Sequence, residues 1–416
     1  MLMSLGLVAR ASARTLYVAP SGNDGNPGSL ERPWMSIRRV NGAALKPGDM
    51  VRFQGGKTQV WDPPGTSGQP TTYLAPQSGV TYNSYGTGQA RISSPSNADV
   101  FFYGNSNVVI ENLELTGGQD QDAIASHGTD GAAPSSGVIV YGNTIHDRAN
   151  GVHTGFADSD WTVERNRISD MSDNGIFFDR RNRPCVNFQT YDGSRGMKAL
   201  YNTIARVGQN PPYPAHGIYD NSVGGEVVGN AISAFGNGKP AGDGSLGSSG
   251  VSIRFRDSVV ADNVLDGQDV AHTNGIDFFA MDSVAGGSAR WERNRISGVS
   301  HAGIYVAREF PGSQDCNGQP RPGALAPAQA FRIAENTIAT TGNRGAMIDF
   351  EYPNGSLTLS GNVGAGATRF EQEPPKPSRP NAVRLVQSDG DLLSGAAWPG
   401  ARAVLRVADR VLALLR

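Results

Sequence analysis

The chain has 416 residues, of which 38% are hydrophobic and 54 are glycine, so glycine is nearly twice as frequent as its usual share of about 7%. The formal net charge of -2 argues against nucleic-acid binding, which normally requires a basic face. No apolar run reaches the roughly 18 residues of a membrane-spanning helix, so none is expected. The length allows two or three domains, although repetitive β architectures of this size can form a single unit.

The first 13 residues have the pattern of a short signal peptide. An apolar stretch, Leu2–Ala9, is followed by Ala11, Ser12 and Ala13, which fit a cleavage site made of small residues. The positively charged start of a typical signal is missing, so a disordered leader is the alternative. We therefore expect residues 1–13 to be a signal peptide and the protein to be secreted or periplasmic.

Two short motifs recur along the chain and predict the fold. One is Asn-x-(Ile/Leu/Val) after aliphatic residues, and the other is Gly followed by an aliphatic residue or alanine. Each unit then holds two or three very short strands, which can pair only with the equivalent strands of the next unit. This predicts an all-β parallel β-helix over residues 14–370. The motifs start at Asn112, Asn143, Asn166, Asn202, Asn230, Asn263, Asn294, Asn336 and Asn362, and at Gly151, Gly175, Gly217, Gly250, Gly275, Gly303 and Gly345, with Ala123 as an earlier variant.

The recurrent asparagine is predicted to be structural. Asparagine tolerates a left-handed backbone at a turn, and its amide can bond an asparagine in the next coil. Longer spacings between motifs mark insertions, and insertions in a solenoid are loops that often lie on the binding face.

The chain changes character after residue 370. Residues 371–400 begin with the Pro-rich, charged stretch EQEPPKPSRP and are interpreted as a linker. Residues 401–416 carry apolar residues at helical spacing and predict an amphipathic helix. This helix would cap the end of the main domain, or contact a partner or a membrane surface.

The opening of the chain carries a resemblance to a known group of proteins. Residues 16–56 read LYVAPSGNDGNPGSLERPWMSIRRVNGAALKPGDMVRFQGG. This stretch resembles the N-terminal cap and first coil of right-handed parallel β-helix proteins of the pectate-lyase-like superfamily, and the two repeated motifs are similar to the same group. The resemblance implies a short capping helix near residues 36–45. It implies a carbohydrate-active protein, but the superfamily includes lyases, hydrolases, epimerases and non-catalytic members.

The strand phase predicts which side chains face outward. Counted from the glycine of each motif, positions +1 and +3 point into the core, and positions +2 and +4 point out. The outward positions mix carboxylates, arginines, tyrosines and a histidine. Seven coils make a groove about 30 Å long, which suits a polysaccharide chain. Aromatic faces would stack on sugar rings, and charged groups would bind carboxylates or hydroxyls.

Twelve residues on or beside this face are candidates for the site. Asp220 falls at an inward position, so either the strand bulges and turns it outward or it is a buried structural acid. Arg254 and Arg256 could clamp a carboxylate together. The catalytic candidates are Asp179, Arg180, His216, Tyr219, Asp220, Arg254 and Asp277, and the substrate-binding candidates are His153, Arg181, Arg256, Tyr305 and Arg308.

The arginine-rich face favours an acidic substrate, and the leading hypothesis is a polysaccharide lyase that acts on uronates by β-elimination. Arg180 and Arg254 could neutralise the substrate carboxylate. The base would be Tyr219, His216 or Arg254, of which the arginine needs the strongest perturbation. Asp179 and Asp277 could instead hold Ca²⁺, but no dense metal motif is visible and no cofactor is assigned.

Three alternatives stay open. A glycoside hydrolase would use two of the carboxylates Asp179, Asp220 and Asp277 on neighbouring coils. A uronate C5-epimerase shares the first step of the lyase, although the usual Asp-Pro-His motif is absent. A non-catalytic polysaccharide-binding protein needs no acid or base.

The two cysteines, Cys185 and Cys316, follow strands that the repeat places four coils apart, about 19 Å. A disulfide would require both loops to arch toward each other, because the Cα atoms of a bridge lie only about 4.4–6.8 Å apart. Their pairing is left open.

Overall fold

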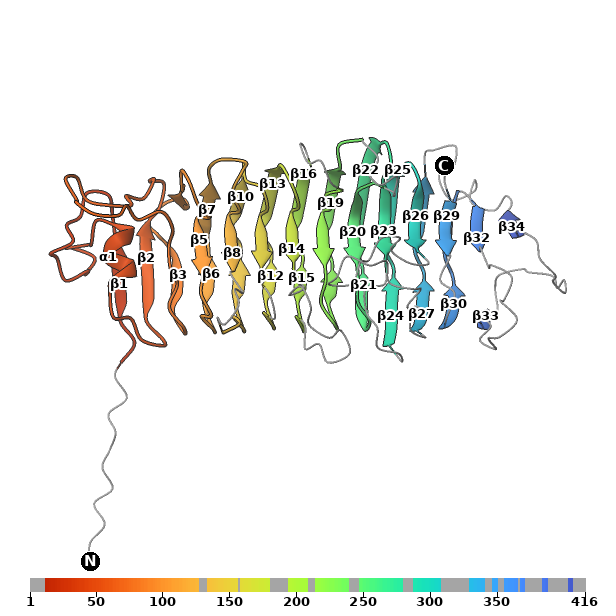
Figure 1. Ribbon diagram of the computed structural model, residues 1–416, viewed down its shortest axis with the longest axis horizontal. Coiled ribbons are helices and arrows are strands. Elements are labelled where there is room, and N and C mark those ends of the chain that lie inside the picture. The colour runs from red at the N-terminus through yellow and green to blue at the C-terminus, as the bar shows by residue number, and fades with distance from the viewer. Residues whose placement is uncertain are drawn as a thin grey trace, which may run out of the picture.

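The computed structural model is an elongated stack of coils in which successive coils add strands to three sheets (Figure 1). Strands joined by crossovers in one parallel sheet wind right-handed in nearly all proteins. The expected parallel β-helix is therefore confirmed. The described residues are 12–126, 133–155, 158–179, 194–208, 214–238, 247–279, 287–307, 329–340, 346–350, 355–365, 367–370, 384–387 and 403–406.

Each sheet lies along one side of the stack, and the three are named here in the order in which a coil visits them. The first sheet contains β1 (Thr15–Val18), β2 (Met50–Gln54), β3 (Thr81–Tyr85), β6 (Val109–Glu111), β9 (Ile139–Tyr141), β12 (Thr162–Glu164), β15 (Lys198–Leu200), β18 (Glu226–Val228), β21 (Ser258–Ala261), β24 (Gly287–Glu292), β27 (Gln329–Ala334), β30 (Gly355–Ser360) and β33 (Arg384–Gln387). The second contains β4 (Ala90–Ile92), β7 (Leu113–Thr116), β10 (Thr144–His146), β13 (Arg167–Met171), β16 (Thr203–Val207), β19 (Ala231–Phe235), β22 (Val264–Val270), β25 (Arg295–Val299), β28 (Thr337–Thr340) and β31 (Val363–Ala365). The third contains β5 (Val100–Phe102), β8 (Ile124–Ser126), β11 (Val152–Thr154), β14 (Ile176–Phe178), β17 (Ile218–Asp220), β20 (Ser249–Ile253), β23 (Asn274–Phe278), β26 (Ala302–Val306), β29 (Ala346–Phe350), β32 (Ala367–Phe370) and β34 (Ala403–Arg406).

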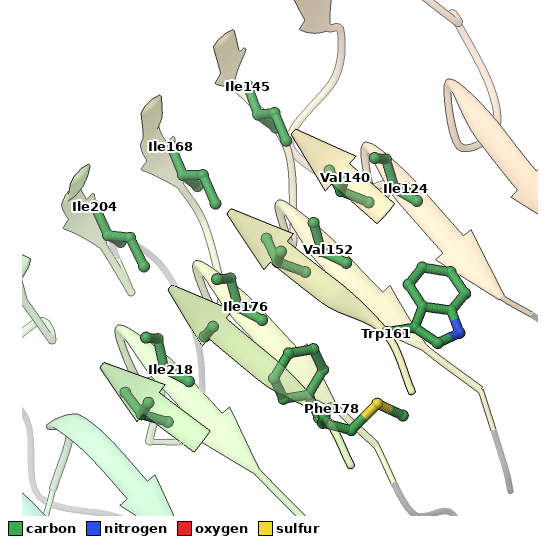
Figure 2. Packing of buried hydrophobic residues seen from close by; sticks show 14 of the residues in the cluster. Ile124, Val140, Ile145, Val152, Trp161, Ile168, Ile176, Phe178, Ile204 and Ile218 are labelled. Carbon is green, nitrogen blue, oxygen red and sulfur yellow. The ribbon is translucent and has the colours of Figure 1, made fainter. Parts of the chain in front are cut away.

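The core is built from rows of aliphatic side chains that repeat from coil to coil (Figure 2). Val152, Ile176 and Ile218 are register partners on β11, β14 and β17, and all three are fully buried. Ile145 and Ile168 form part of an equivalent row on the second sheet. Because coils lie only about 4.8 Å apart, each side chain packs on its equivalents above and below. The inward phase predicted for positions +1 and +3 is confirmed in these coils.

An asparagine ladder joins the first sheet to the second. The backbone N–H and the side-chain Nδ2 of Asn202 both donate to Oδ1 of Asn230, at 2.9 and 3.0 Å, and Nδ2 also donates to the carbonyl of Val163. The same pattern runs from Asn143 to Asn362 with every member buried or half-buried. The structural role predicted for the recurrent asparagine is thus confirmed.

The backbone conformation of this turn differs from the expectation. The left-handed residue is the one before the ladder asparagine, with φ of 55° at both Arg165 and Tyr201. The asparagine itself is instead fixed by hydrogen bonds, of which Asn202 donates three and accepts two. Asn112 is the exception, because it has φ of 52°, and Leu113 takes the ladder position and donates its N–H to Asn143.

The helix expected near the N-terminus is confirmed, whereas the helix expected at the C-terminus is not formed in its described residues. The expected capping helix is α1 (Ile37–Asn41), which begins at Ser36, whose side chain accepts from the N–H of Arg39. The amphipathic helix expected over residues 401–416 is not formed at Ala403–Arg406. These residues are strand β34, antiparallel to β32, because the edge of the third sheet offers unpaired backbone groups.

Several expectations lie outside the described residues. These are residues 1–11 of the signal peptide expected over residues 1–13, both cysteines, and the linker over 371–400 apart from strand β33. In the described part, no helix is long and apolar enough to cross a membrane.

Candidate active site

The outward face of the third sheet presents one row of register-matched side chains. The row runs through Phe101, Ala125, His153, Phe177, Tyr219, Ser252, Asp277 and Tyr305. Phe101, His153, Phe177 and Tyr219 are half-exposed and Ala125 is buried, whereas Ser252 and Asp277 are fully buried although they point away from the core. Three predicted site residues, Arg180, Arg181 and Arg308, lie outside the described residues.

Planar side chains on this face stack on one another in a column parallel to the stack axis. The ring of Phe177 lies 4.7 Å from that of His153 and 4.8 Å from that of Tyr219, with nearly parallel planes. The guanidinium carbon of Arg254 lies 4.7 Å from the ring centre of Tyr219 and 4.8 Å from that of Phe279. The faces of these groups are therefore used within the protein, and the expected stacking of sugar rings on them is not supported. A ligand can therefore contact only the polar edges of these side chains, such as the Tyr219 hydroxyl and the Arg254 N–H groups.

Asp277 holds the guanidinium of Arg254 in place. Arg254 Nη1 donates to Asp277 Oδ1 at 3.1 Å, and the hydroxyls of Ser249 and Ser252 donate to the two carboxylate oxygens. The pair is almost completely buried, with side-chain exposures of 6% and 1%. Burial opposes the charge, but the neighbouring Tyr219 and Asp277 raise the pKa of Arg254 above its ordinary value.

Arg254 also reaches the phenol of its stacking partner. Its Nε donates to the hydroxyl oxygen of Tyr219 at 3.3 Å. Tyr219 in turn lies beside His216, with 4.9 Å between ring centres. We call Tyr219, Arg254, Asp277 and His216 the guanidinium cluster, and the structure brings together all four of these predicted catalytic residues.

His216 belongs to a second ladder at the start of the third-sheet strands. Asn174 Nδ2 donates to Asn150 Oδ1 at 3.0 Å, and the N–H of His216 donates to Asn174 Oδ1 at 2.7 Å. Nδ1 of His216 then accepts the N–H of Ser249 at 3.1 Å, in the place of an amide oxygen. A backbone N–H can only donate, so Nδ1 carries no proton and the neutral ring carries it on Nε2. Burial lowers the pKa of His216 to about 4, so the ring is neutral at pH 7.

Asp122, the first member of this second ladder, contacts His153, whose pKa is shifted in the opposite direction to that of His216. Asp122 Oδ1 accepts from Asn150 Nδ2 at 2.8 Å, and its Oδ2 lies 2.8 Å from Nδ1 of His153. Nε2 of His153 lies 3.5 Å from Asp179. Burial favours the neutral imidazole, but the two carboxylates outweigh it and raise the pKa of His153 to about 9. We call Asp122, His153 and Asp179 the imidazolium cluster.

Asp122 was missed by sequence reasoning, although a signal for it exists. It precedes Ala123 and Ile124, which align with the Gly-aliphatic motif, so Asp122 occupies the position of Asn150 and Asn174. A carboxylate at this ladder position accepts hydrogen bonds but cannot donate one onward, so the ladder ends at Asp122. Its negative charge can also hold a cation, here the imidazolium of His153. Phe279 was at an outward position but was not singled out.

The structure does not support the expected catalytic role of Asp220. It is completely buried at an inward position of β17, where it accepts from the N–H and the hydroxyl of Ser222. A Cβ added to Gly225 would lie 1.8 Å from its Oδ2, so the acid fills the space that the glycine leaves. Burial raises the pKa of Asp220 to about 6. The strand does not bulge, and Asp220 is a buried acid of the core rather than a group in the groove.

Two substrate-binding candidates, Arg256 and Tyr305, do not join the guanidinium cluster. Arg256 does not join Arg254 in a clamp, because it pairs with Asp257 at 3.5 Å and runs against Gly287, at the start of β24 in the first sheet. Tyr305 is on the outward row but is only 8% exposed, and it packs edge-on against Phe279.

The described residues do not fit a calcium site at Asp179 and Asp277. Asp277 already accepts two hydroxyls and a guanidinium, and Asp179 faces the cationic His153. No group of three acidic, histidine or cysteine side chains placed to hold a metal occurs in the described part of the chain.

Comparisons with known proteins agree with the fold. Residues 80–257 match the family described as the right-handed β-helix region. The GH136 lacto-N-biosidase from Eubacterium ramulus superposes with a TM-score of 0.50 at 13% identity, over 90% of this chain and 67% of that protein. An alginate lyase from Paenibacillus sp. str. FPU-7 gives 0.48 at 16% identity over 85% and 99%, and a rhamnogalacturonan lyase gives 0.45 at 15% over 81% and 84%.

These identities are low enough that the structural matches speak to fold alone. No curated protein matches the chain by sequence. Residues 80–257 thus match a right-handed β-helix region, and the described part of the chain has a right-handed parallel β-helix fold.

Proposed function

We propose that the protein is a polysaccharide lyase that cleaves an acidic, uronate-containing chain by β-elimination at the guanidinium cluster. In this reaction a base removes the C5 proton, a C4=C5 double bond forms, and the C4–O bond breaks as the leaving oxygen takes a proton. A cation at the uronate carboxylate makes the C5 proton removable. The site therefore needs a fixed cation, a base and a proton donor.

The position of Tyr219 between His216 and Arg254 carries the proposal. His216 is a poor base, since its Nδ1 is engaged by Ser249, its Nε2 already holds a proton, and its pKa is about 4. Arg254 is no base either, because its pKa is raised above the ordinary arginine value. Of the three candidate bases, Tyr219 remains. In this step Tyr219 acts as the phenolate, which accepts the hydrogen bond of Arg254 Nε. It takes the C5 proton, and the hydroxyl so formed delivers that proton to the leaving oxygen, which restores the phenolate.

Arg254 supplies the cation. Three of its five N–H groups are used, by Tyr219, by the carbonyl of Ile253 and by Asp277. Among the described residues, the two N–H groups on Nη2 have no hydrogen-bond partner and can bind a carboxylate. The buried contacts hold the guanidinium plane before substrate arrives, so little reorganisation is needed during the reaction. The Nε2–H of His216 is a second, uncharged donor at the same place.

Hydrolysis is less well supported by the same geometry. A glycosidase needs two carboxyl groups on either side of the bond to be cleaved. Asp220 points into the core, and Asp277 lies under Arg254 with both oxygens engaged. Asp179 faces the groove but is held at the imidazolium of His153.

The test is a panel of acidic and neutral polysaccharides, with and without a chelator. Ultraviolet absorbance from unsaturated uronates and new reducing ends are recorded together. The proposal expects both signals to rise on an acidic polymer, to persist in chelator, and to disappear in the Y219F variant. Reducing ends without absorbance would contradict it and indicate a hydrolase.

Two further outcomes would also contradict a lyase. Exchange of the C5 proton with solvent, without either signal, would indicate an epimerase. Retention on a polysaccharide column without any of these changes would indicate a binding protein.

A further inference from the structure

Three aromatic side chains that the proposed reaction does not use lie together at the N-terminal end of the third sheet. The ring centre of Tyr73 is 5.5 Å from that of Phe101 and 5.9 Å from that of Tyr103, and those of Phe101 and Tyr103 are 4.6 Å apart. Their planes are tilted by 36° to 49°. We call Tyr73, Phe101 and Tyr103 the aromatic platform.

Phe101 connects the platform to the row of side chains that contains Tyr219 and Asp277. Phe101 on β5 is the register partner of Ala125, which pairs with His153, and the row continues through Phe177 to Tyr219. β5 and β17 are four coils apart, which corresponds to about 19 Å. Several linked sugars span this distance. A chain bound at Tyr219 and lying along the outward face of the third sheet would reach the platform.

The platform and the column differ in how far their aromatic rings are covered by other side chains. In the column, Phe177 is stacked on both faces by nearly parallel rings. Tyr103 is 51% exposed, which is high for a tyrosine that touches two other aromatic rings. Burying an exposed tyrosine against a ligand gains apolar contact, while its hydroxyl keeps a polar partner.

The platform carries no charge of its own at neutral pH. Burial, followed by a hydrogen bond with Tyr73, raises the pKa of Tyr103 to about 12, so its phenol is protonated. Recognition here must therefore use ring faces and hydroxyl groups. The apolar C–H face and the hydroxyl rim of a pyranose ring match both.

We infer that the aromatic platform is a distal subsite that binds pyranose rings of the same glycan chain that is cleaved at the guanidinium cluster. The inference deepens the proposed function and rests on it for the acidic class of glycan. Recognition of the ring itself does not depend on that class. A subsite so far from the reacting bond would act on long chains and leave short ones unaffected, because only long chains reach it.

The test uses binding, so that it does not depend on turnover. The Y219F variant is titrated calorimetrically with alginate and polygalacturonate oligosaccharides of two to eight units, with cello-oligosaccharides as a neutral series. We expect affinity to rise with length, and Y103A to remove this rise, weakening the longest ligands about tenfold. Y103F should retain the rise because it keeps the ring.

The chain offers a matched control. Tyr201 is 53% exposed, lies at the turn between β15 and β16, and packs near Arg165 rather than on the third sheet. Y201A should leave the affinity at every length unchanged. Equal effects of Y103A and Y201A would overturn the inference, as would the absence of any length-dependent binding by the protein. Length dependence with the neutral series alone would contradict the acidic substrate while leaving the platform in place.

Discussion

His153 and His216 lie on the third sheet beside one ladder, yet their environments favour different charge states, cationic for His153 and neutral for His216. His153 lies between Asp122 and Asp179, which raise its pKa to about 9. Burial lowers the pKa of His216 to about 4, and its Nδ1 is used as a ladder acceptor. The difference shows that the ladder fixes the backbone position of a residue, whereas the charged or apolar side chains around each imidazole determine its protonation state.

The charges around the two histidines separate the roles of their clusters. The imidazolium cluster pairs one cation with two carboxylates, so it is a poor place to bind another carboxylate. The guanidinium cluster pairs Arg254 with the single acid Asp277 and keeps a neutral histidine beside it. The second arrangement suits a uronate.

The largest effect is expected at Tyr219. Y219F removes the hydroxyl that exchanges protons with substrate but keeps the ring stacked between Phe177 and Arg254. We expect kcat to fall by about 1,000-fold, within the range for loss of a general acid–base group. Steady-state kinetics on the best polymer measure it. A fall of less than tenfold would remove Tyr219 from the reaction.

The next effect is expected at Arg254. R254K keeps a positive charge but loses the planar fork that reaches Tyr219 and Asp277 together. We expect kcat/KM to fall by about 100-fold, because the carboxylate loses a preorganised partner. R256K is the control, since Arg256 pairs with Asp257 away from the groove. Equal losses in both variants would contradict the placement of the cation.

The pH dependence of stability should differ in sign between the two histidines. His153 has a folded pKa above its ordinary 6.5, so its contribution is complete below pH 6.5 and is lost as the pH rises through about 9. His216 has a folded pKa below 6.5, so its contribution is present above pH 6.5 and is lost as the pH falls through about 4. Each is worth about 3 kcal/mol in the free energy of unfolding.

Denaturant unfolding from pH 4 to pH 9 tests both signs. H153Q should flatten the alkaline limb, and H216N should flatten the acidic limb. A variant that flattened the opposite limb would show that the charge states are assigned the wrong way round.

The smallest effect concerns the ladder at His216. H216N should keep an acceptor for the N–H of Ser249, as Asn174 does for His216 one coil earlier. H216A leaves that buried N–H without a partner, which costs about 1–3 kcal/mol. We expect H216A to be less stable than H216N at pH 7 by this amount. Equal stabilities would mean that the ladder bond contributes nothing.

Much of the fold could be predicted from the sequence because the repeat is local. The Gly-aliphatic motif gave the inward phase correctly at Val152 and Ile176, and Asn-x-Ile marked the ladder. The phase also placed Tyr219, Arg254 and Asp277 on one face. The C-terminal segment was misjudged because apolar residues at helical spacing can equally pair with an open sheet edge, as Ala403–Arg406 do.

The chemistry of the site was less accessible. The strand phase put Asp220 at an inward position but left open whether a bulge turns it outward. It did not show that Asp277 lies buried under Arg254, because burial depends on residues from several coils. The pairing of Asp122 with His153 joins residues 31 positions apart and became visible only in the folded chain. The stacking of Phe177 on both faces likewise depends on the spacing between coils.

If the guanidinium cluster carries the reaction and the imidazolium cluster does not, variants of the two clusters must differ sharply in activity. Elimination on one acidic polymer is followed by ultraviolet absorbance for Y219F and H153Q in parallel, with folding checked by thermal unfolding. We expect Y219F to lose about 1,000-fold in kcat and H153Q to stay within about tenfold, since His153 exchanges no proton with substrate. The reverse order would contradict the account.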